Sequence, residues 1–445
     1  MGSRPLQRLM PQHTDTPRAR AVAHLAKRCA AFPRLHPESV DVAGLSPRDA
    51  SLAIAIDRAV VVRWSLLQGL LERRLKAPWT KQHPELQAIL LAGAAQLLLL
   101  DKLPDHAVLH EAVECAKASV RPRAAGMVNA VLRRIAELRV ERVETADPDN
   151  PAHLLHADGG GWLLSEPLPG KDDLARLAAQ AGMHASVLER WVTTSGIEIA
   201  RYRALHSIVE PPIIMRGDDV PGTPHTIDGF TVLEPGTPIA DVFAASPDAQ
   251  VQDPASAKAV EATAALTPSM IIDPCAGRGT KSRQLAALHP DAQVIGADTH
   301  PGRAQDLARA AEAVPNLQAM DFAALQQLAG QADLLLLDVP CTNTAVLPRR
   351  PEARHRLDRR TRRAMREKQR QIAANTMGLL ADGGHLLWST CSIDPEENEQ
   401  QVRWLCEYHP MSVVDTKITE PAGLPGDPPG AYHDGAFHAL LRRTV

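Results

Sequence analysis

The second half of the chain alternates short apolar segments with helix-forming segments, and this rhythm constrains the fold more than any other feature. Strands that are apolar along their whole length and separated by helices are typical of a mostly parallel sheet covered on both faces. We therefore predict an α/β, Rossmann-like domain over residues 251–445. Its five expected strands are Met270–Asp273, Gln293–Asp298, Leu317–Asp321, Ala332–Asp338 and Gly384–Thr390.

The first part of the chain has another pattern, because its apolar residues recur at three- and four-residue spacing from about residue 17 to 142. This spacing predicts amphipathic helices. Asp, Pro and Gly then become frequent, and mixed helical and short β-like segments follow up to about residue 250. We predict an all-helical domain over residues 1–145, a linker with a small α/β connecting domain over 146–250, and the parallel-sheet domain over 251–445. The expected helices are Ser51–Leu75, Pro84–Leu100, His106–Ala118 and Arg123–Leu138.

Composition excludes several classes of protein. With 44% hydrophobic and 23% charged residues, the chain resembles an average globular protein. Its first eight residues lack the apolar run of a secretory signal, and the longest apolar run, Ala88–Leu100, is too short to span a membrane. The six cysteines are widely spread and lack C-x-x-C spacing, which argues against a disulfide scaffold and a metal site. We expect a cytoplasmic monomer that holds no metal and contacts no membrane.

The loop after the first predicted strand indicates a ligand. From Asp273 to Ser282 it reads Asp-Pro-Cys-Ala-Gly-Arg-Gly-Thr-Lys-Ser, a turn of small residues that lets backbone N–H groups approach a ligand closely. The loop departs from a P-loop at Cys275 and Thr280 and matches a dinucleotide fingerprint only in part. Asp298, at the end of the second strand, suits the ribose hydroxyls of a nucleoside. The pattern indicates a nucleotide or nucleoside and leaves open which one binds.

Two cysteines follow the ends of the fourth and fifth predicted strands, in Asp338-Val-Pro-Cys341 and Ser389-Thr-Cys391-Ser392. Both could be inert small hydrophobic residues. Ligands of parallel sheets bind at the carboxyl ends of strands, however, and a thiol beside a carboxylate there suggests covalent catalysis. Addition of a thiolate to C6 of a pyrimidine turns C5 into an enamine-like nucleophile. Asp338 could form a hydrogen bond to ring N3 or protonate it, and so stabilise the charge that develops on the base.

Two segments concentrate positive charge. Lys117–Arg142 has a net charge of +5, and Leu347–Ala374, which lies between the two cysteines, has eleven basic against three acidic residues. The alternative for each segment is a solvated surface. Next to a site that handles a base, we interpret them as contacts to a nucleic-acid backbone. The candidate contacts are Arg133, Arg134, Arg349, Arg350, Arg359, Arg360, Arg362 and Arg363.

These motifs occur in an order that resembles the Sun family of RNA 5-methylcytosine methyltransferases, including the bacterial enzymes that act on small-subunit ribosomal RNA. The resemblance covers nearly the whole chain, and the helical front is similar to the family's NusB-like RNA-binding domain. Thr-Cys-Ser followed by Pro-Glu-Glu-Asn is highly specific, whereas the glycine loop alone is not. The segments that carry the resemblance are Gln252–Ser256, Asp273–Lys281, Asp338–Cys341, Ser389–Ser392, Pro395–Asn398 and His433–Ala439, with Leu103–Ala107 and Val128–Arg134 in the helical front.

The resemblance implies methyl transfer from S-adenosylmethionine to C5 of a cytosine in small-subunit ribosomal RNA. It implies that Cys391 is the nucleophile and that Cys341 assists product release. The chain departs from the family in having Gly277-Arg-Gly-Thr280 and Thr342-Asn-Thr-Ala345 where the family has more glycines, although Asn343 tolerates positive φ better than most residues. The residues implied to hold the methyl donor are Cys275, Ala276, Gly277, Arg278, Gly279, Thr280, Lys281, Asp298, Asp321 and Asp338.

Two other functions compete with this hypothesis. The chain could be a catalytically weak assembly factor that keeps the fold and holds ribosomal RNA, although retention of both cysteines and the loop acids favours an enzyme. Methylation of uracil C5 or of an amino group is a weaker alternative. The target nucleotide, and whether naked RNA or an assembling particle is the substrate, do not follow from the sequence.

Overall fold

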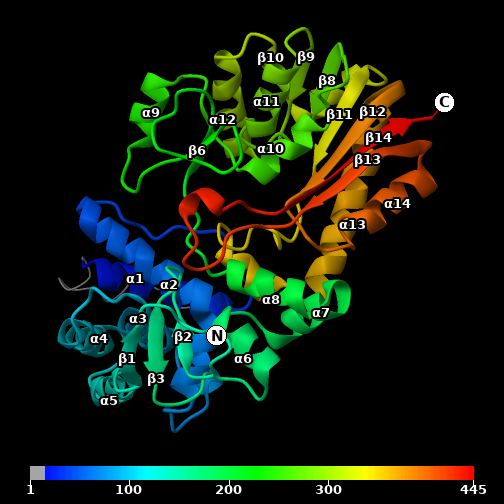
Figure 1. The fold of residues 1–445 in the computed structure, drawn as a ribbon. Coiled ribbons are helices and arrows are strands. Elements are labelled where there is room, and N and C mark those ends of the chain that lie inside the picture. Colours follow the sequence, from blue (N-terminus) through cyan, green and yellow to red (C-terminus); the bar gives the residue numbers. More distant parts are fainter. Residues whose placement is uncertain (1–15, 445) are drawn as a thin grey trace, which may run out of the picture. The chain divides into compact units, whose positions relative to one another are not determined.

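The computed structural model describes residues 16–444, which form two compact units (Figure 1). Unit 1 holds the described residues up to Glu210 together with Leu347–Arg356 and Leu424–Gly426. Unit 2 holds the rest of the described chain from Pro211 onward. The first eight residues, on which the expected absence of a secretory signal depends, lie outside the described residues.

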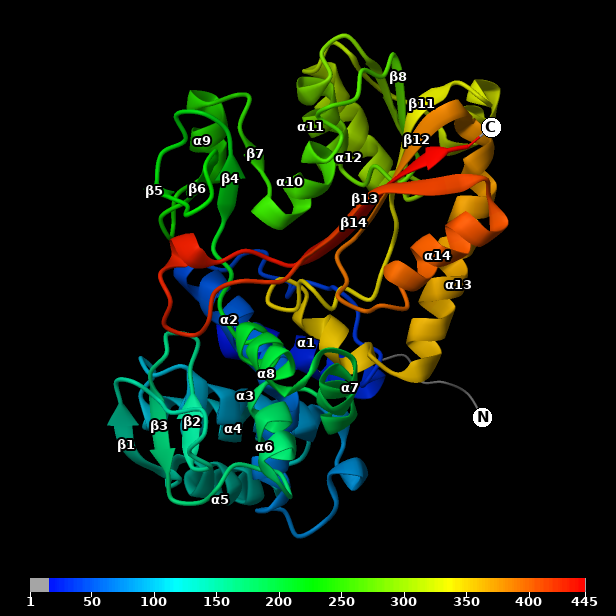
Figure 2. The same cartoon turned by 45° about the vertical axis from the view of Figure 1, so that its right-hand side comes forward.

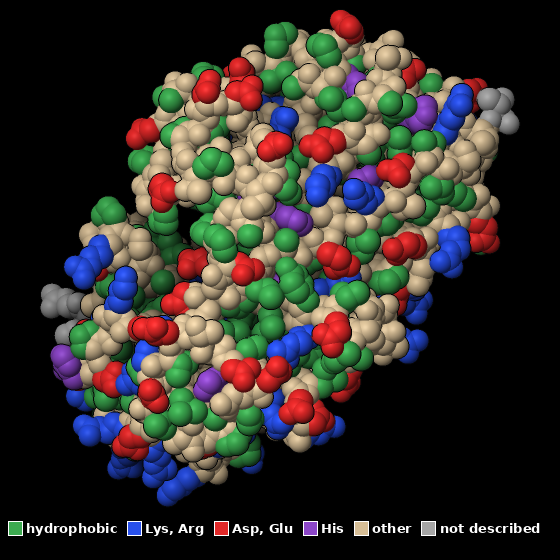
Figure 3. Space-filling view, in the orientation of Figure 1, with side chains coloured by type: hydrophobic (Ala, Val, Ile, Leu, Met, Phe, Trp, Pro, Cys, Tyr) green, Lys and Arg blue, Asp and Glu red, His purple; other side chains and the backbone are tan. Residues whose placement is uncertain are grey.

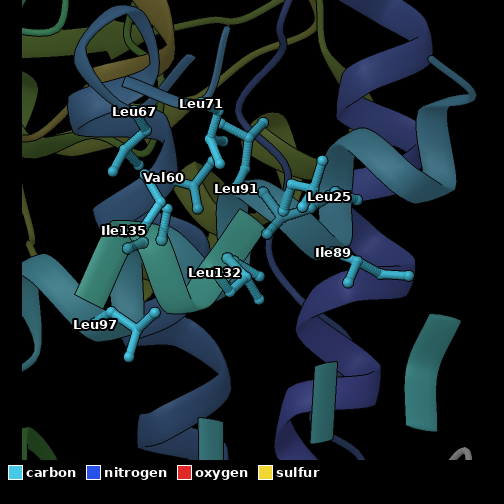
Figure 4. Close-up of a cluster of buried hydrophobic side chains, with 14 of the residues drawn as sticks. Leu25, Val60, Leu67, Leu71, Ile89, Leu91, Leu97, Leu132 and Ile135 are labelled. Atoms are coloured by element: carbon cyan, nitrogen blue, oxygen red, sulfur yellow. The ribbon is translucent and has the colours of Figure 1, made fainter. Parts of the chain in front are cut away.

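Unit 1 begins with five helices whose starts follow from local sequence. The first three helices each begin at a proline, and the side chains of Thr16 and Ser46 accept bonds from the first backbone N–H groups of two of them. Leucine, valine and isoleucine side chains from these helices form one buried cluster (Figure 4). The helices are α1 Pro17–Ala31, α2 Pro47–Glu72, α3 Pro84–Leu99, α4 Asp105–Ser119 and α5 Ala124–Ala136.

The helical pattern does not continue to residue 142 as expected, because Arg139–Val143 is a strand, β1. It pairs with β3, Gly161–Leu164, which pairs in turn with β2, His153–Leu155, so strands lie within the predicted linker. Buried Leu154 and Leu164 join the cluster formed by the five helices. Unit 1 continues with α6 Asp173–Gln180, α7 Ala185–Ser195 and α8 Ile197–His206, and its residues 351–356 form a 3₁₀ helix.

Unit 2 is organised by a seven-stranded sheet in the order β10-β9-β8-β11-β12-β14-β13. The first five strands of that order are parallel, and β14 pairs antiparallel with both β12 and β13. The five predicted strands are therefore confirmed as neighbours, whereas β13 and β14 were not predicted. The strands are β8 Met270–Asp273, β9 Gln293–Gly296, β10 Leu317–Ala319, β11 Ala332–Asp338, β12 Leu380–Thr390, β13 Met411–Thr419 and β14 Ala436–Arg443.

Helices cover both faces of this sheet, as the apolar strands require (Figure 2). One buried cluster joins β11 and β12 to α13, Arg359–Thr376, and to α14, Glu399–Tyr408. Another joins the opposite side chains of the same strands to α10, Pro254–Glu261, and α11, Thr280–Leu288. Alternate residues such as Leu335 and Leu336 fall in different clusters, because neighbouring side chains of a strand point to opposite faces.

A small antiparallel sheet precedes the large one in unit 2. It contains β4 Ile214–Arg216, β5 Thr223–Pro224, β6 Phe230–Val232 and β7 Gln250–Val251, with α9 Ile239–Ala245 beside it. Another helix of the unit, α12 Pro301–Glu312, packs beside β10. Within residues 16–444, no helix is both long enough and apolar enough to cross a membrane.

Candidate active site

Four carboxylates lie at the carboxyl ends of four neighbouring strands. Asp273 and Asp338 are the last residues of β8 and β11, while Asp298 and Asp321 follow β9 and β10. Because β10, β9, β8 and β11 are adjacent and parallel, these residues share one edge of the sheet. This is the edge at which open α/β sheets bind ligands.

The loop after β8 is shaped by two glycines and by Asp298. Gly277 and Gly279 have φ values of +60° and +88°, a region that residues with a Cβ rarely adopt. The loop therefore has glycine at these two positions of positive φ, although it has fewer glycines than the family pattern. The Asp298 carboxylate accepts the Gly277 N–H at 3.1 Å and the His300 N–H at 2.7 Å. Arg303 also lies 3.1 Å from it. Asp298 therefore stabilises the loop that we expect to hold the ligand.

Asp273 stabilises this loop through hydrogen bonds to two of its residues. Its buried carboxylate accepts the Ser282 hydroxyl at 2.7 Å and the Cys275 N–H at 3.2 Å. Burial raises the pKa of Asp273 to about 7. Burial likewise raises the pKa of the Cys275 thiol, so this cysteine is not an activated nucleophile.

Not every predicted donor contact has an evident part in the site. The Arg278 side chain is 77% exposed and pairs with Asp306 at 3.1 Å. Asp321 is exposed, and its carboxylate accepts the Ala323 N–H at 2.8 Å. Ala276 is buried and Thr280 begins α11, so both contribute to the turn into the helix.

Lys281 extends from α11 to the end of β11. Its ammonium donates to the Asp338 carboxylate at 2.7 Å. Burial disfavours the charged amine, but attraction to Asp338 outweighs this cost, so the pKa of Lys281 is raised. Negative charge on Cys391 would raise that pKa further, which means that the ammonium and this sulfur are electrostatically coupled.

The two predicted thiols meet although fifty residues separate them. Sγ of Cys341 and Sγ of Cys391 lie 3.0 Å apart, and Cys391 also contacts Oδ1 of Asn343 at 3.2 Å. Asn343 has φ +60°, as its tolerance of positive φ allows. Cys341 is buried, and its contact with Cys391 together with burial raises its pKa well above the usual value. Burial and this contact therefore favour the protonated form of Cys341.

Glu397 holds the two thiol-bearing loops together, a role that sequence reasoning missed. Its fully buried carboxylate accepts the Thr342 N–H at 3.0 Å, the Ser392 hydroxyl at 2.6 Å and the Gln369 amide at 2.9 Å. Thr342 and Ser392 directly follow the two cysteines. The only sequence signal was the Pro-Glu-Glu-Asn motif, which indicated the family but no role for this glutamate.

The arginine-rich segment is divided between the two units. Arg359, Arg360 and Arg363 are exposed on α13 in unit 2, where Arg363 pairs with Glu367 at 2.8 Å. Arg362 is largely buried and donates to the Leu357 carbonyl at 2.8 Å. The exposed side chains on α13 form a basic surface that we call the α13 face: Arg359, Arg360, Arg363 and Lys368.

Residues 347–356 of the same segment belong to unit 1. Arg354 is 1% exposed and donates to the carbonyls of Val62 and Ser207, so this member of the basic run cannot contact a nucleic-acid backbone. Arg350 pairs with Glu352 at 3.0 Å, and Arg349 is half-buried and engaged within the protein.

The other basic segment forms a second positive surface, on unit 1. Figure 3 shows Lys and Arg side chains gathered where α5 lies in Figure 1. Arg139 and Arg142 are not part of a helix face as expected, since they lie on β1 and pair with Asp105 and Asp101. The exposed members around α5 are Lys117, Arg121, Arg123, Arg133 and Arg134.

Comparisons with known proteins agree with this architecture. The family model described as 16S rRNA methyltransferase RsmB/F matches residues 263–439, and the NusB family model matches residues 30–137. Ribosomal RNA small subunit methyltransferase B of Yersinia pseudotuberculosis serotype O:1b is 28% identical over 397 residues, covering 84% of this chain and 86% of the relative. The protein of that name from Yersinia pestis is equally similar. The crystal structure of PH0851 superposes with a TM-score of 0.69 at 20% identity, covering 98% of this chain and 99% of that one.

Proposed function

Because the RsmB/F family model matches residues 263–439 and the NusB model matches residues 30–137, we propose that the chain methylates C5 of a cytosine in small-subunit ribosomal RNA, as a member of the RsmB/F family. The protein is an S-adenosylmethionine-dependent RNA methyltransferase. The cytosine, the C5 position and a covalent Cys391–C6 adduct are the parts that we propose. Ribosomal RNA as the substrate would place this work in the cytoplasm.

The residues around the loop after β8 fit the methyl donor. A Cβ at Gly277 or Gly279 would require strained backbone. The Gly277 N–H is bonded to Asp298 and the Gly279 N–H to the Ala276 carbonyl at 2.8 Å, so these bonds fix the turn that leads into α11. Asp298 offers carboxylate oxygen to ribose hydroxyls. S-adenosylmethionine supplies an electrophilic methyl group when bound, and the chain's own residues must supply the activated base.

The geometry of the thiols supports Cys391 as the nucleophile, and this is the observation that carries the proposal. Cys341 keeps its proton and lies 3.0 Å from Cys391, so it can donate to a Cys391 thiolate. The Lys281 ammonium stabilises negative charge on the same sulfur. Attack by Cys391 on C6 forms a carbon–sulfur bond and moves the electron pair of the C5=C6 bond toward N3.

To complete the reaction, the base must lose its C5 proton and be released from Cys391. After C5 has taken the methyl group, water takes the C5 proton and the Cys391–C6 bond breaks, which restores the ring double bond and frees the thiolate. Cys341 is placed next to that sulfur and is the residue we assign to this release. Asp338 is held by Lys281 at the same edge and is the group we assign to N3 of the base.

The positive surfaces of the two units supply the proposed RNA contacts. On α13 and around α5 the exposed guanidinium and ammonium groups suit phosphates, which fix the position of an RNA without reading its sequence. The alternative of a catalytically weak assembly factor is not favoured, because the thiol pair, Lys281 and Asp338 form a complete set of reacting groups.

Adduct trapping tests the proposal. Each variant is incubated with ribosomal RNA and S-adenosylmethionine, denatured and run on a gel, while mass analysis of nucleosides reads the product. Cys391→Ala should abolish 5-methylcytidine and any protein–RNA adduct, because no enamine forms. Cys341→Ala should let the adduct accumulate, because release is slowed. An adduct with Cys391→Ala and none with Cys341→Ala would make Cys341 the nucleophile, and methylation at another atom would refute C5 specificity.

A further inference from the structure

The side chain of Gln369 lies between the α13 face and the active-site loops. It is fully buried on the inner side of α13, and its amide N–H groups reach the Pro340 carbonyl at 3.0 Å and Glu397 at 2.9 Å. Its amide oxygen accepts from Gln401 of α14 at 2.9 Å. Gln369 therefore uses both its donors and its acceptor. One donor bond reaches the segment that carries Cys341, and the other reaches Glu397, which follows Cys391 in the chain.

Cys341 is held on each side by this pair of residues. The carbonyl before it is bonded to Gln369, and the N–H after it lies 3.0 and 3.2 Å from the two Glu397 oxygens. The Thr342 hydroxyl also donates to Glu397. A rotation or shift of α13 would thus pull on the backbone at Cys341 from both directions.

Cys391 is held by the other half of the same network. Glu397 accepts the Ser392 hydroxyl at 2.6 Å, while the neighbouring Asn398 donates to the Ser392 carbonyl at 2.8 Å and accepts the Thr390 hydroxyl at 2.7 Å. Among the described residues, the Glu397 carboxylate accepts hydrogen bonds from Thr342, Gln369 and Ser392, none of which is a cation. A buried carboxylate without a cation is costly, so this one needs its full set of donors to stay in place.

We propose that Gln369 and Glu397 are positioning residues that set the separation of the two catalytic thiols and couple it to the placement of α13. The second half of this proposal rests on the proposed function, because it takes the α13 face to be an RNA contact. RNA that docks on the outer side of α13 would then act on the thiols through the inner side of the same helix. Neither residue touches the base or the methyl donor in this arrangement.

The spacing of the thiols can be measured without RNA. Phenylarsine oxide condenses with two neighbouring thiols to form two arsenic–sulfur bonds and release water, with no change in the oxidation state of arsenic or sulfur. Wild-type protein should bind one equivalent tightly, and Cys341→Ser gives the background of the remaining cysteines. Gln369→Leu keeps the volume but removes both donors, and should weaken arsenical binding about tenfold, the effect of roughly one buried hydrogen bond.

Conservative variants separate positioning from general destabilisation. Glu397→Gln keeps one carbonyl oxygen for the Thr342 and Gln369 N–H groups, and its amide N–H groups can donate to hydroxyls that also accept. It should retain arsenical binding within about threefold, whereas Glu397→Ala should lose it. Gln371→Leu is the matched control on α13, because that side chain is exposed and bonds to Asn375. Retained affinity for S-adenosylmethionine shows that each variant folds.

The coupling to RNA is tested by measuring RNA affinity and single-turnover methylation separately in each variant. Gln369→Leu should keep RNA affinity within about twofold and lower single-turnover methylation about tenfold, because the α13 face is intact but the thiols are misplaced. The triple variant Arg359→Gln/Arg360→Gln/Arg363→Gln should show the reverse, with weaker RNA binding and unchanged arsenical binding. Unchanged arsenical binding in both Gln369→Leu and Glu397→Ala would overturn the positioning role. If the triple variant binds RNA normally while Gln369→Leu still loses the arsenical, the positioning role stands and the RNA contact at α13 fails.

Discussion

Replacing Asp298 by alanine should weaken binding of S-adenosylmethionine far more than binding of RNA. Oδ1 of Asp298 accepts the His300 N–H and lies 3.1 Å from Arg303, while Oδ2 accepts the Gly277 N–H. Because a carboxylate oxygen has two lone pairs, Oδ2 keeps one for a ribose hydroxyl at full strength. Loss of one bond to a charged group costs about 1.5–3 kcal/mol, which corresponds to a roughly 10- to 150-fold weaker Kd.

Calorimetric titration measures this loss directly. Asp298→Ala also frees the Gly277 N–H, so part of the effect comes from a less ordered loop. Arg303→Gln separates the two causes, because it leaves the carboxylate and its backbone bonds but removes the competing cation. It should bind the methyl donor at least as well as the wild type. Unchanged donor affinity in Asp298→Ala, with an unchanged melting temperature, would refute the role of this carboxylate.

Two further predictions concern charge. Neutralising Arg359, Arg360 and Arg363 together should make the slope of log affinity for RNA against log salt shallower by about 2, since each lost phosphate contact removes roughly 0.7. Arg309, exposed on α12, provides the control, and an unaltered slope in the triple variant would place the three arginines on a solvated surface. Asp273 has a folded-state pKa of about 7, raised by burial, so its contribution to stability is full below about pH 4 and is lost as the pH rises through 7. Denaturant unfolding of wild type and Asp273→Asn from pH 4 to 8 should therefore show a difference of up to a few kcal/mol that falls with pH, whereas parallel curves would contradict the raised pKa.

Much of the site was predictable because parallel strands impose a simple rule. Continuous apolar segments identified β8, β9, β10, β11 and β12, and the carboxyl ends of parallel strands share an edge. Residues that follow those ends, such as Asp298, Asp338 and Cys391, could therefore be grouped without knowing any distance. β13 and β14 escaped this reasoning. β13 is an exposed edge strand without a continuous apolar run. β14 pairs with β12 and β13, and no local sequence pattern predicts which strands a segment will pair with.

The basic segment shows where a sequence pattern runs out. Arg354 and Arg359 look equivalent in a run of arginines, since both carry the same charge a few residues apart. In the folded chain Arg354 is buried against backbone carbonyls of unit 1, and Arg359 is exposed on α13 of unit 2. Charge counts measure how many cations a segment has, but burial decides which of them can reach a phosphate, and burial depends on residues far away in the chain.

The sequence by itself determined the fold class and predicted the edge of the sheet at which the candidate site and its two thiols lie, because periodicity and strand ends are local properties. Only the tertiary structure decided that the two thiols meet, that Cys341 is buried and what holds the pair together. Those properties arise where Cys341 meets Cys391 and where Glu397 reaches Thr342, fifty-five residues earlier in the chain. A hydrogen bond depends on separations of about 3 Å in space, and a linear pattern of residues carries no such distance.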